Sequence, residues 1–133
     1  MDWGVIYLYW AIKFRIYSLL CGFEIPANVF GKGLSIAHKG PIIVNSHARI
    51  GQNCRIHVCV NIGTSPEADN LAPIIGNNCY IGPGAKIWGK IFIGDNTVIG
   101  ANAAVGKSFQ EGNCCIAGVP ARIISNKGRC IGK

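Results

Sequence analysis

The chain has 133 residues, a length typical of a single domain. Half of the residues are apolar and only 14% are charged, so the composition excludes a disordered chain. The net charge is +7, but the basic residues are scattered and no aromatic RNA-binding motif accompanies them. A phosphate-rich small ligand fits this charge better than a nucleic acid does, and we expect no nucleic-acid partner.

A helix is expected at the start of the chain, in residues 1–22. The run from Val5 to Leu20 (VIYLYWAIKFRIYSLL) is very apolar and rich in aromatic residues. Lys13 and Arg15 interrupt it and it lacks a small-residue cleavage site, so the run favours neither a signal peptide nor a membrane span. We expect a short helix that packs on the main body or on a neighbouring subunit, with weak peripheral membrane contact as the alternative.

From Ile75 onward the sequence repeats every six residues. A large aliphatic residue takes the first position of each unit, at Ile75, Ile81, Ile87, Ile93, Ile99 and Val105. Glycine is common at the second position and Asn or Gly at the fourth, and these residue types tolerate the positive φ of a sharp corner. Neither a helix nor a simple strand produces this spacing.

The same frame extends upstream to Phe30, with an insertion at Ile42–Ile43 and a longer one after Ile62. A six-residue unit with one corner gives a triangular coil, and stacked turns of such a coil pair their short strands in parallel. We therefore predict an all-β fold, a parallel β-helix over residues 23–124, followed by a basic tail over residues 125–133.

The seven cysteines show no CxxC spacing, and their number is odd. Several fall at positions that should point inward, Cys54 and Cys79 among them. We interpret them as small buried residues in a reducing compartment, which predicts a cytoplasmic protein without a disulfide framework or a zinc site.

Four stretches carry a resemblance to a known family: GKGLSIAHKGPIIVN, IGQNCRIHVCVNIGT, IGPGAKIWGKIFIGDNTVIGANAAV and AGVPARII. On these motifs, residues 30–123 resemble the hexapeptide-repeat acyltransferase superfamily. The most similar members are the serine acetyltransferase-like branch and its short relatives from surface-polysaccharide gene clusters. The resemblance implies a left-handed coil, a homotrimer, and acetyl-CoA as co-substrate in grooves between neighbouring subunits.

His38, within IAHKGP, matches the catalytic position of this family. The resemblance implies that it acts as the general base that takes the proton from an acceptor hydroxyl, and an imidazole suits that task near neutral pH. Glu24 is the candidate for the carboxylate that orients this histidine. His57 lies about one coil further on and is a candidate substrate contact. The spacing of the three histidines does not match the zinc enzymes of this fold, so we expect no metal.

The resemblance also implies a cofactor site. Gly63, Ala85 and Ala103 match small positions along the pantetheine arm of CoA. Lys107 and Arg122 match the part of the family that meets the nucleotide end, where cationic side chains suit its phosphates.

The acceptor is where this sequence departs from serine acetyltransferases. Polar residues of that branch are replaced here by Ala37, Leu71 and Ala72. The segment Thr64–Ile74 instead offers a polar set for the acceptor, Ser65, Glu67, Asp69 and Asn70. Our first hypothesis is therefore O-acetylation of a small hydroxylated acceptor, a sugar in surface-polysaccharide biosynthesis. Serine O-acetylation and a non-catalytic β-helix assembly module are the alternatives.

Overall fold

The computed structural model describes residues 2–129 and begins with one helix, α1 (Trp3–Cys21). Asp2 caps its first turn, because the Asp2 carboxylate accepts a hydrogen bond from Gly4 N at 3.0 Å. Gly22 ends the helix in the left-handed conformation, with φ of 78°, and its N–H donates to the Ser18 carbonyl.

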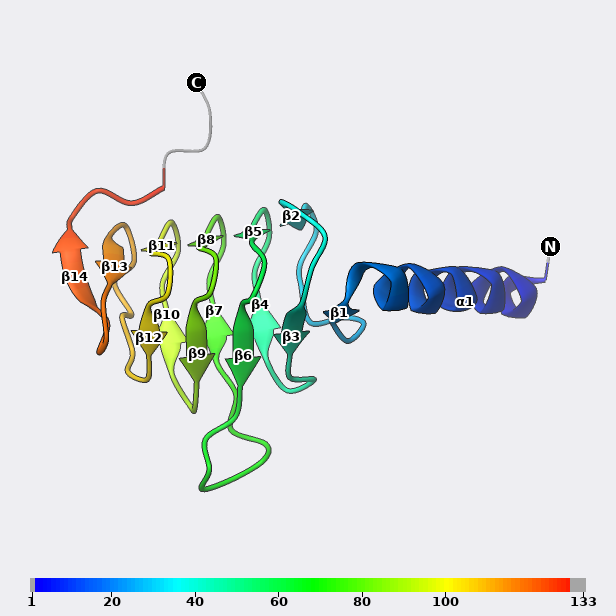
Figure 1. Cartoon of the computed structure of the whole chain (residues 1–133), viewed down its shortest axis with the longest axis horizontal. Coiled ribbons are helices and arrows are strands. Elements are labelled where there is room, and N and C mark those ends of the chain that lie inside the picture. The colour runs from blue at the N-terminus through cyan, green and yellow to red at the C-terminus, as the bar shows by residue number, and fades with distance from the viewer. Residues whose placement is uncertain (1, 130–133) are drawn as a thin grey trace.

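Fourteen short strands follow in the described part of the chain. Their bounds are β1 (Phe23–Glu24), β2 (Ser35–Ile36), β3 (Ile42–Val44), β4 (Arg49–Ile50), β5 (Arg55–Ile56), β6 (Asn61–Gly63), β7 (Ile74–Ile75), β8 (Tyr80–Ile81), β9 (Lys86–Trp88), β10 (Phe92–Ile93), β11 (Val98–Ile99), β12 (Ala104–Val105), β13 (Cys115–Ala117) and β14 (Arg122–Ser125). From β3 to β12, consecutive strands enter three different sheets in turn, so the chain winds as a triangular β-helix (Figure 1).

We name the three sheets as faces. Face A has the order β1-β3-β6-β9-β12, face B has β10-β7-β4, and face C has β14-β13-β11-β8-β5-β2. All pairings between these strands are parallel except that of β13 with β14, which is antiparallel. The chain passes from face A to face B, then to face C, and back to face A.

The interior is a stack of aliphatic side chains. In face C, Ile56, Ile81 and Ile99 are in register and fully buried. The first position of each six-residue unit is thus the inward position, as the repeat predicts. Burial of each isoleucine contributes about 1.5–3 kcal/mol, so the stack supplies most of the hydrophobic stabilisation.

The corners use the residues that the fourth position of the repeat supplies. Asn78, Asn96 and Asn102 have φ between 56° and 58°. The Asn78 amide donates to Asn96 Oδ1 at 3.1 Å, and the Asn96 amide donates to Asn113 Oδ1 at 2.8 Å. These side chains therefore form a hydrogen-bonded ladder along one corner of the coil.

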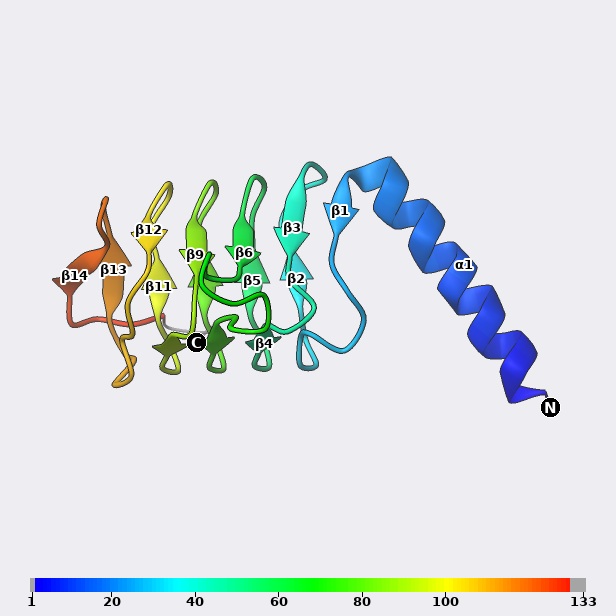
Figure 2. The ribbon, with the colours of Figure 1, turned by 90° about the horizontal axis from the view of Figure 1, so that it is seen from below.

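The helix lies within residues 1–22, where the sequence predicts it, although with this helix the chain as a whole is not all-β. It extends away from the β-helix and contacts it mainly at β1, with every one of its residues exposed or half-buried (Figure 2). The expected packing on the main body is therefore not found, while packing on a neighbouring subunit stays a prediction. By length and composition alone, α1 is long and apolar enough to cross a membrane.

At the other end of the chain, β14 doubles back on β13 and covers the edge of face C. Residues 130–133 of the predicted basic tail, with Cys130 and Lys133, lie outside the described residues.

Candidate functional site

His38 lies at a corner of the coil, between β2 on face C and β3 on face A. The backbone on both sides of it is fixed, because Ala37 N donates to the Ile56 carbonyl at 3.0 Å and Gly40 N donates to the Cys21 carbonyl at 2.8 Å. The His38 side chain is exposed, and within residues 2–129 its imidazole has no hydrogen-bond partner. Both ring nitrogens are free to meet a substrate.

Glu24 lies on the outer side of face A, opposite Ile43 in the pairing of β1 with β3. It lines a polar groove of about 320 Å³ together with Asn45, Asn61 and Thr64. His38 does not line this groove, and no hydrogen bond or ion pair joins Glu24 to His38 in the described part of the chain. In a single subunit, the proposed orienting contact is therefore absent.

His57 lies at the same corner as His38, one coil further along. Its Nδ1 lies 3.0 Å from the Ile81 carbonyl oxygen, and its Nε2 lies 3.4 Å from the Tyr80 hydroxyl. A carbonyl oxygen only accepts, so Nδ1 carries the proton and Nε2 presents its lone pair to the tyrosine. The two rings are 4.7 Å apart. Sequence reasoning did not single out Tyr80, although its place directly before an inward isoleucine marks it as an outward residue of face C.

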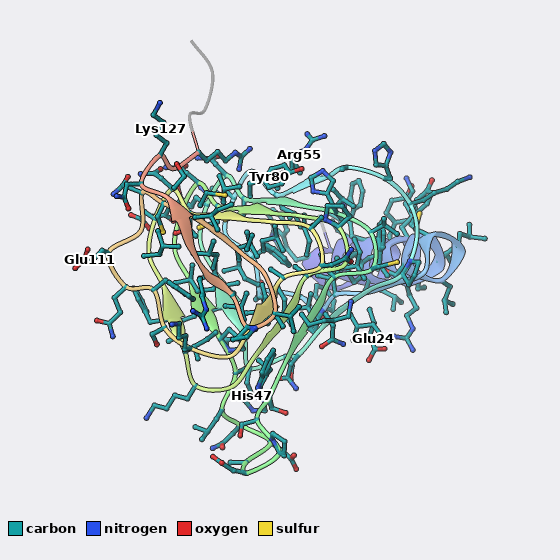
Figure 3. All side chains as sticks on the ribbon, turned by 60° about the vertical axis from the view of Figure 1, so that its left-hand side comes forward. Glu24, His47, Arg55, Tyr80, Glu111 and Lys127 are labelled. Carbon is teal, nitrogen blue, oxygen red and sulfur yellow. The ribbon has the colours of Figure 1, made fainter. Side chains whose placement is uncertain are left out.

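The predicted acceptor residues lie elsewhere, in a loop that projects between β6 and β7 at the corner of faces A and B. Ser65 Oγ accepts from Glu67 N at 3.2 Å, while Asp69 and Asn70 are exposed near the tip. Figure 3 shows the separation, with Arg55 and Tyr80 on one side of the coil and His47 on the other, toward the loop. One subunit therefore does not bring His38 and this loop together.

The predicted cofactor residues fall into two groups. Ala85 and Ala103 are fully buried, so their side chains fill the interior and only their backbone could meet a ligand. Gly63, Lys107 and Arg122 face outward.

A cavity of about 260 Å³ lies beside Lys107, whose Nζ lies 5.4 Å from the centroid of the Phe109 ring. Trp88, Ala104, Gly106 and Pro120 also line this cavity. Trp88 was not singled out from the sequence. A β-carbon at Gly106 would lie 2.5 Å from the Trp88 ring, so the glycine at this position is what allows the indole to approach the backbone so closely.

The described residues do not form a cluster of possible metal ligands. Within residues 2–129, no three His, Cys, Asp or Glu side chains gather as the ligands of an ion would.

Comparisons with known proteins agree with this architecture. The family model described as bacterial transferase hexapeptide (six repeats) matches residues 72–107. The serine acetyltransferase of Synechococcus elongatus is 35% identical over 116 residues, which are 86% of this chain and 47% of the relative. That of Staphylococcus xylosus is 38% identical over 121 residues, 90% of this chain and 56% of the relative. The chain thus spans about half the length of these relatives.

Among solved structures, the serine acetyltransferase of Brucella abortus in complex with coenzyme A superposes with a TM-score of 0.72. It is 33% identical, over 82% of this chain and 42% of that one. The chain therefore belongs to the hexapeptide-repeat acyltransferase superfamily. The similarity to its solved structures implies that the β-helix winds in the left-handed sense. Within that superfamily it lies in the serine acetyltransferase-like branch.

Proposed function

We propose that the protein is an O-acetyltransferase that uses acetyl-CoA. The observation that carries this proposal is the exposed His38 imidazole, free of other partners in the described chain, at the corner where IAHKGP resembles the family's catalytic motif. The named activity of the relatives and the coenzyme A in one of their structures support it.

In the proposed mechanism, His38 takes the proton of the acceptor hydroxyl as the oxygen attacks the thioester carbonyl carbon. The carbon–sulfur bond then breaks, and the imidazolium returns the proton to the departing thiolate. In the same mechanism, Lys107 and Arg122 pair with phosphates at the nucleotide end of CoA, which their exposure and positive charge support.

The acceptor favoured by the comparisons is serine, and the sugar acceptor that we predicted from the sequence finds no support in them. The relatives reported above are all named serine acetyltransferases. Serine is accordingly the first candidate acceptor.

A hydroxylated sugar remains the second candidate because of one observation. Ala72 is buried, and Leu71 and Ala37 are half-buried, at positions where the family's polar residues hold the amino acid. None of them can pair with an ammonium or a carboxylate, and leaving such a charge buried and unpaired costs several kcal/mol. Sugar hydroxyls need only neutral hydrogen bonds, which Ser65 and Asn70 can offer.

A complete site further requires a second subunit, and we propose the homotrimer of the family for this reason. His38 and the loop lie at different corners of one coil. A neighbouring subunit can bring its loop corner to the His38 corner of the first. The free cysteines of the described chain suit a reducing compartment, and we propose the cytoplasm.

Thiol release from acetyl-CoA, measured with L-serine and with a panel of sugars, tests the proposal. Saturable turnover with serine, at a Michaelis constant of roughly a millimolar or below, would establish the first candidate. Saturation by a sugar alone would establish the second. If no hydroxylated acceptor accelerates thiol release, the proposed activity is wrong.

A further inference from the structure

The helix α1 carries most of the exposed apolar surface of the molecule. Its exposed large side chains are Trp3, Val5, Tyr7, Leu8, Tyr9, Trp10, Ile12, Phe14, Ile16, Tyr17, Leu19 and Leu20. Soluble proteins rarely leave a contiguous apolar surface of this size uncovered. Something outside the described chain must therefore cover this helix.

The apolar residues surround the helix instead of forming one stripe. Ile12 and Phe14 are both 51% exposed, and two residues correspond to about 200° around a helix, so they lie on nearly opposite sides. A helix that docks on a protein surface or joins a three-helix bundle buries one face and keeps polar residues on the other. A second copy of this chain would thus leave about half of these side chains in water, whereas a helix embedded at the level of the lipid headgroups meets lipid on every side.

The charges on α1 are all of one sign. Lys13 and Arg15 are its charged side chains, it contains no acidic residue, and the whole chain carries a net charge of +7. Lys13 Nζ lies 5.3 Å from the ring centroid of Tyr9 and 5.2 Å from that of Trp10. Aromatic rings beside a basic group are typical of residues at the level of lipid headgroups, and basic groups favour anionic lipid.

The charges and the position of the helix indicate how it would meet a bilayer. Lys13 and Arg15 lie near the middle of the 19 residues, so α1 keeps both charges among the headgroups when it lies along the bilayer surface, whereas a spanning helix would place them in the hydrocarbon core. The helix projects from the β1 end of the β-helix (Figures 1 and 2). Its last residue, Cys21, accepts a hydrogen bond from Gly40 N beside the His38 corner, so lipid around α1 would lie near that corner.

We propose that α1 lies along the surface of an anionic lipid bilayer, among the headgroups, and attaches the β-helix to the membrane. The proposal does not depend on acetyl transfer, since its test measures binding alone.

Flotation with phosphatidylcholine vesicles, with and without added phosphatidylglycerol, provides the test. The full chain should float with the vesicles, and more strongly when phosphatidylglycerol is present. The triple variant Leu8→Gln/Ile12→Gln/Ile16→Gln should partition about tenfold less or weaker still. These three residues touch no part of the β-helix groove beside α1, so the fold should survive the change.

Two control variants test whether vesicle binding depends on α1 or on other exposed residues of the same kind. Val119→Gln/Ile123→Gln/Ile124→Gln changes three equally exposed apolar residues in the last coil and should float like the parent. Lys13→Gln/Arg15→Gln should lose the preference for anionic vesicles, whereas Lys32→Gln/Lys90→Gln should keep it. In a Trp88→Phe background, Trp3 and Trp10 are the remaining tryptophans, and their emission should shift to the blue on binding.

The proposal is overturned if the protein does not float, or if the α1 variant floats as well as the parent. It is also overturned if α1 instead drives self-association that the triple variant abolishes, without any binding to vesicles. In that case a second copy of the chain covers the helix.

Discussion

The Nδ1 atom of His57 lies 3.0 Å from the carbonyl oxygen of Ile81, one coil further along the same face. This bond fixes the ring and its tautomer, so Nε2 faces the Tyr80 hydroxyl at 3.4 Å. His57 is thus held in place by its own chain, whereas the exposed His38 is free to meet a substrate.

We predict that His57→Ala raises the Michaelis constant for the acceptor several-fold and leaves kcat within about threefold, because a positioned contact acts mainly on binding. Tyr80→Phe should have a smaller effect in the same direction, since it removes one hydroxyl and keeps the ring. Steady-state kinetics with varied acceptor measure both. A fall in kcat of two orders of magnitude in His57→Ala would instead make His57 the base.

His38→Ala should lower turnover by about two to four orders of magnitude, the range for loss of a general base. Affinity for acetyl-CoA, measured by calorimetry, should change little, because His38 addresses the acceptor. Lys32→Ala is the control, since Lys32 is also exposed at a corner but between faces B and C, away from both the loop and His38. Near-normal turnover in His38→Ala would contradict the assignment.

The asparagine ladder predicts a stability effect at Asn96. Asn96→Ala removes the bonds to Asn78 and Asn113 and puts alanine, which tolerates the left-handed region less well than asparagine, at φ of 57°, so it should cost about 2–4 kcal/mol of unfolding free energy. Asn96→Gly loses the same bonds without the backbone strain and should cost about half as much. Urea denaturation followed by circular dichroism measures both. Equal stability of the two variants would show that the corner is not strained.

The coil was predictable from the sequence because each position of the repeat has one physical task. An inward isoleucine such as Ile81 and a corner asparagine such as Asn78 can be identified from their spacing alone. The site was less predictable, because spacing gives the corner on which a residue lies but not the direction of its side chain. Ala85 and Ala103 recur at the right interval for a cofactor groove, yet they point into the core.

The helix was the least predictable element. Its composition indicated a helix, but composition alone does not say whether an apolar helix packs on its own domain. In this structure α1 does not pack on its own domain, and none of its residues is buried.

The burial of two cysteines predicts that their thiols react slowly with alkylating reagents. Cys54 and Cys79 are fully buried, and a hydrogen bond with Cys54 together with burial raises the pKa of the Cys79 thiol. The same hydrogen bond lowers the pKa of the Cys54 thiol to about 7, so Cys54 is protected only by its burial. We expect both to resist an alkylating reagent under native conditions, whereas the exposed Cys59 should react quickly. Mass spectrometry of the labelled protein measures this. Rapid labelling of Cys54 and Cys79 in the folded state would contradict the inward frame of the repeat.

The outer faces of the coil predict how subunits associate. Ile74 and Phe92 are neighbours on face B and both are exposed to nearly half of their surface, while Ile43 and Trp88 are similarly exposed on face A. Apolar residues on two different faces suit a ring in which face A of one subunit meets face B of the next. Such a ring closes with three subunits when neighbouring subunits are related by a threefold rotation.

Light scattering should therefore give about three times the chain mass of 14.2 kDa. The measurement is best made in the Leu8→Gln/Ile12→Gln/Ile16→Gln background, where α1 contributes little association. Phe92→Asp should produce monomers and abolish acetyl transfer, because the loop of one subunit would no longer reach His38 of another. Ile123→Asp, on the exposed β14, should leave the trimer intact. A monomer that still transfers acetyl groups at the parent rate would show that one subunit builds the whole site.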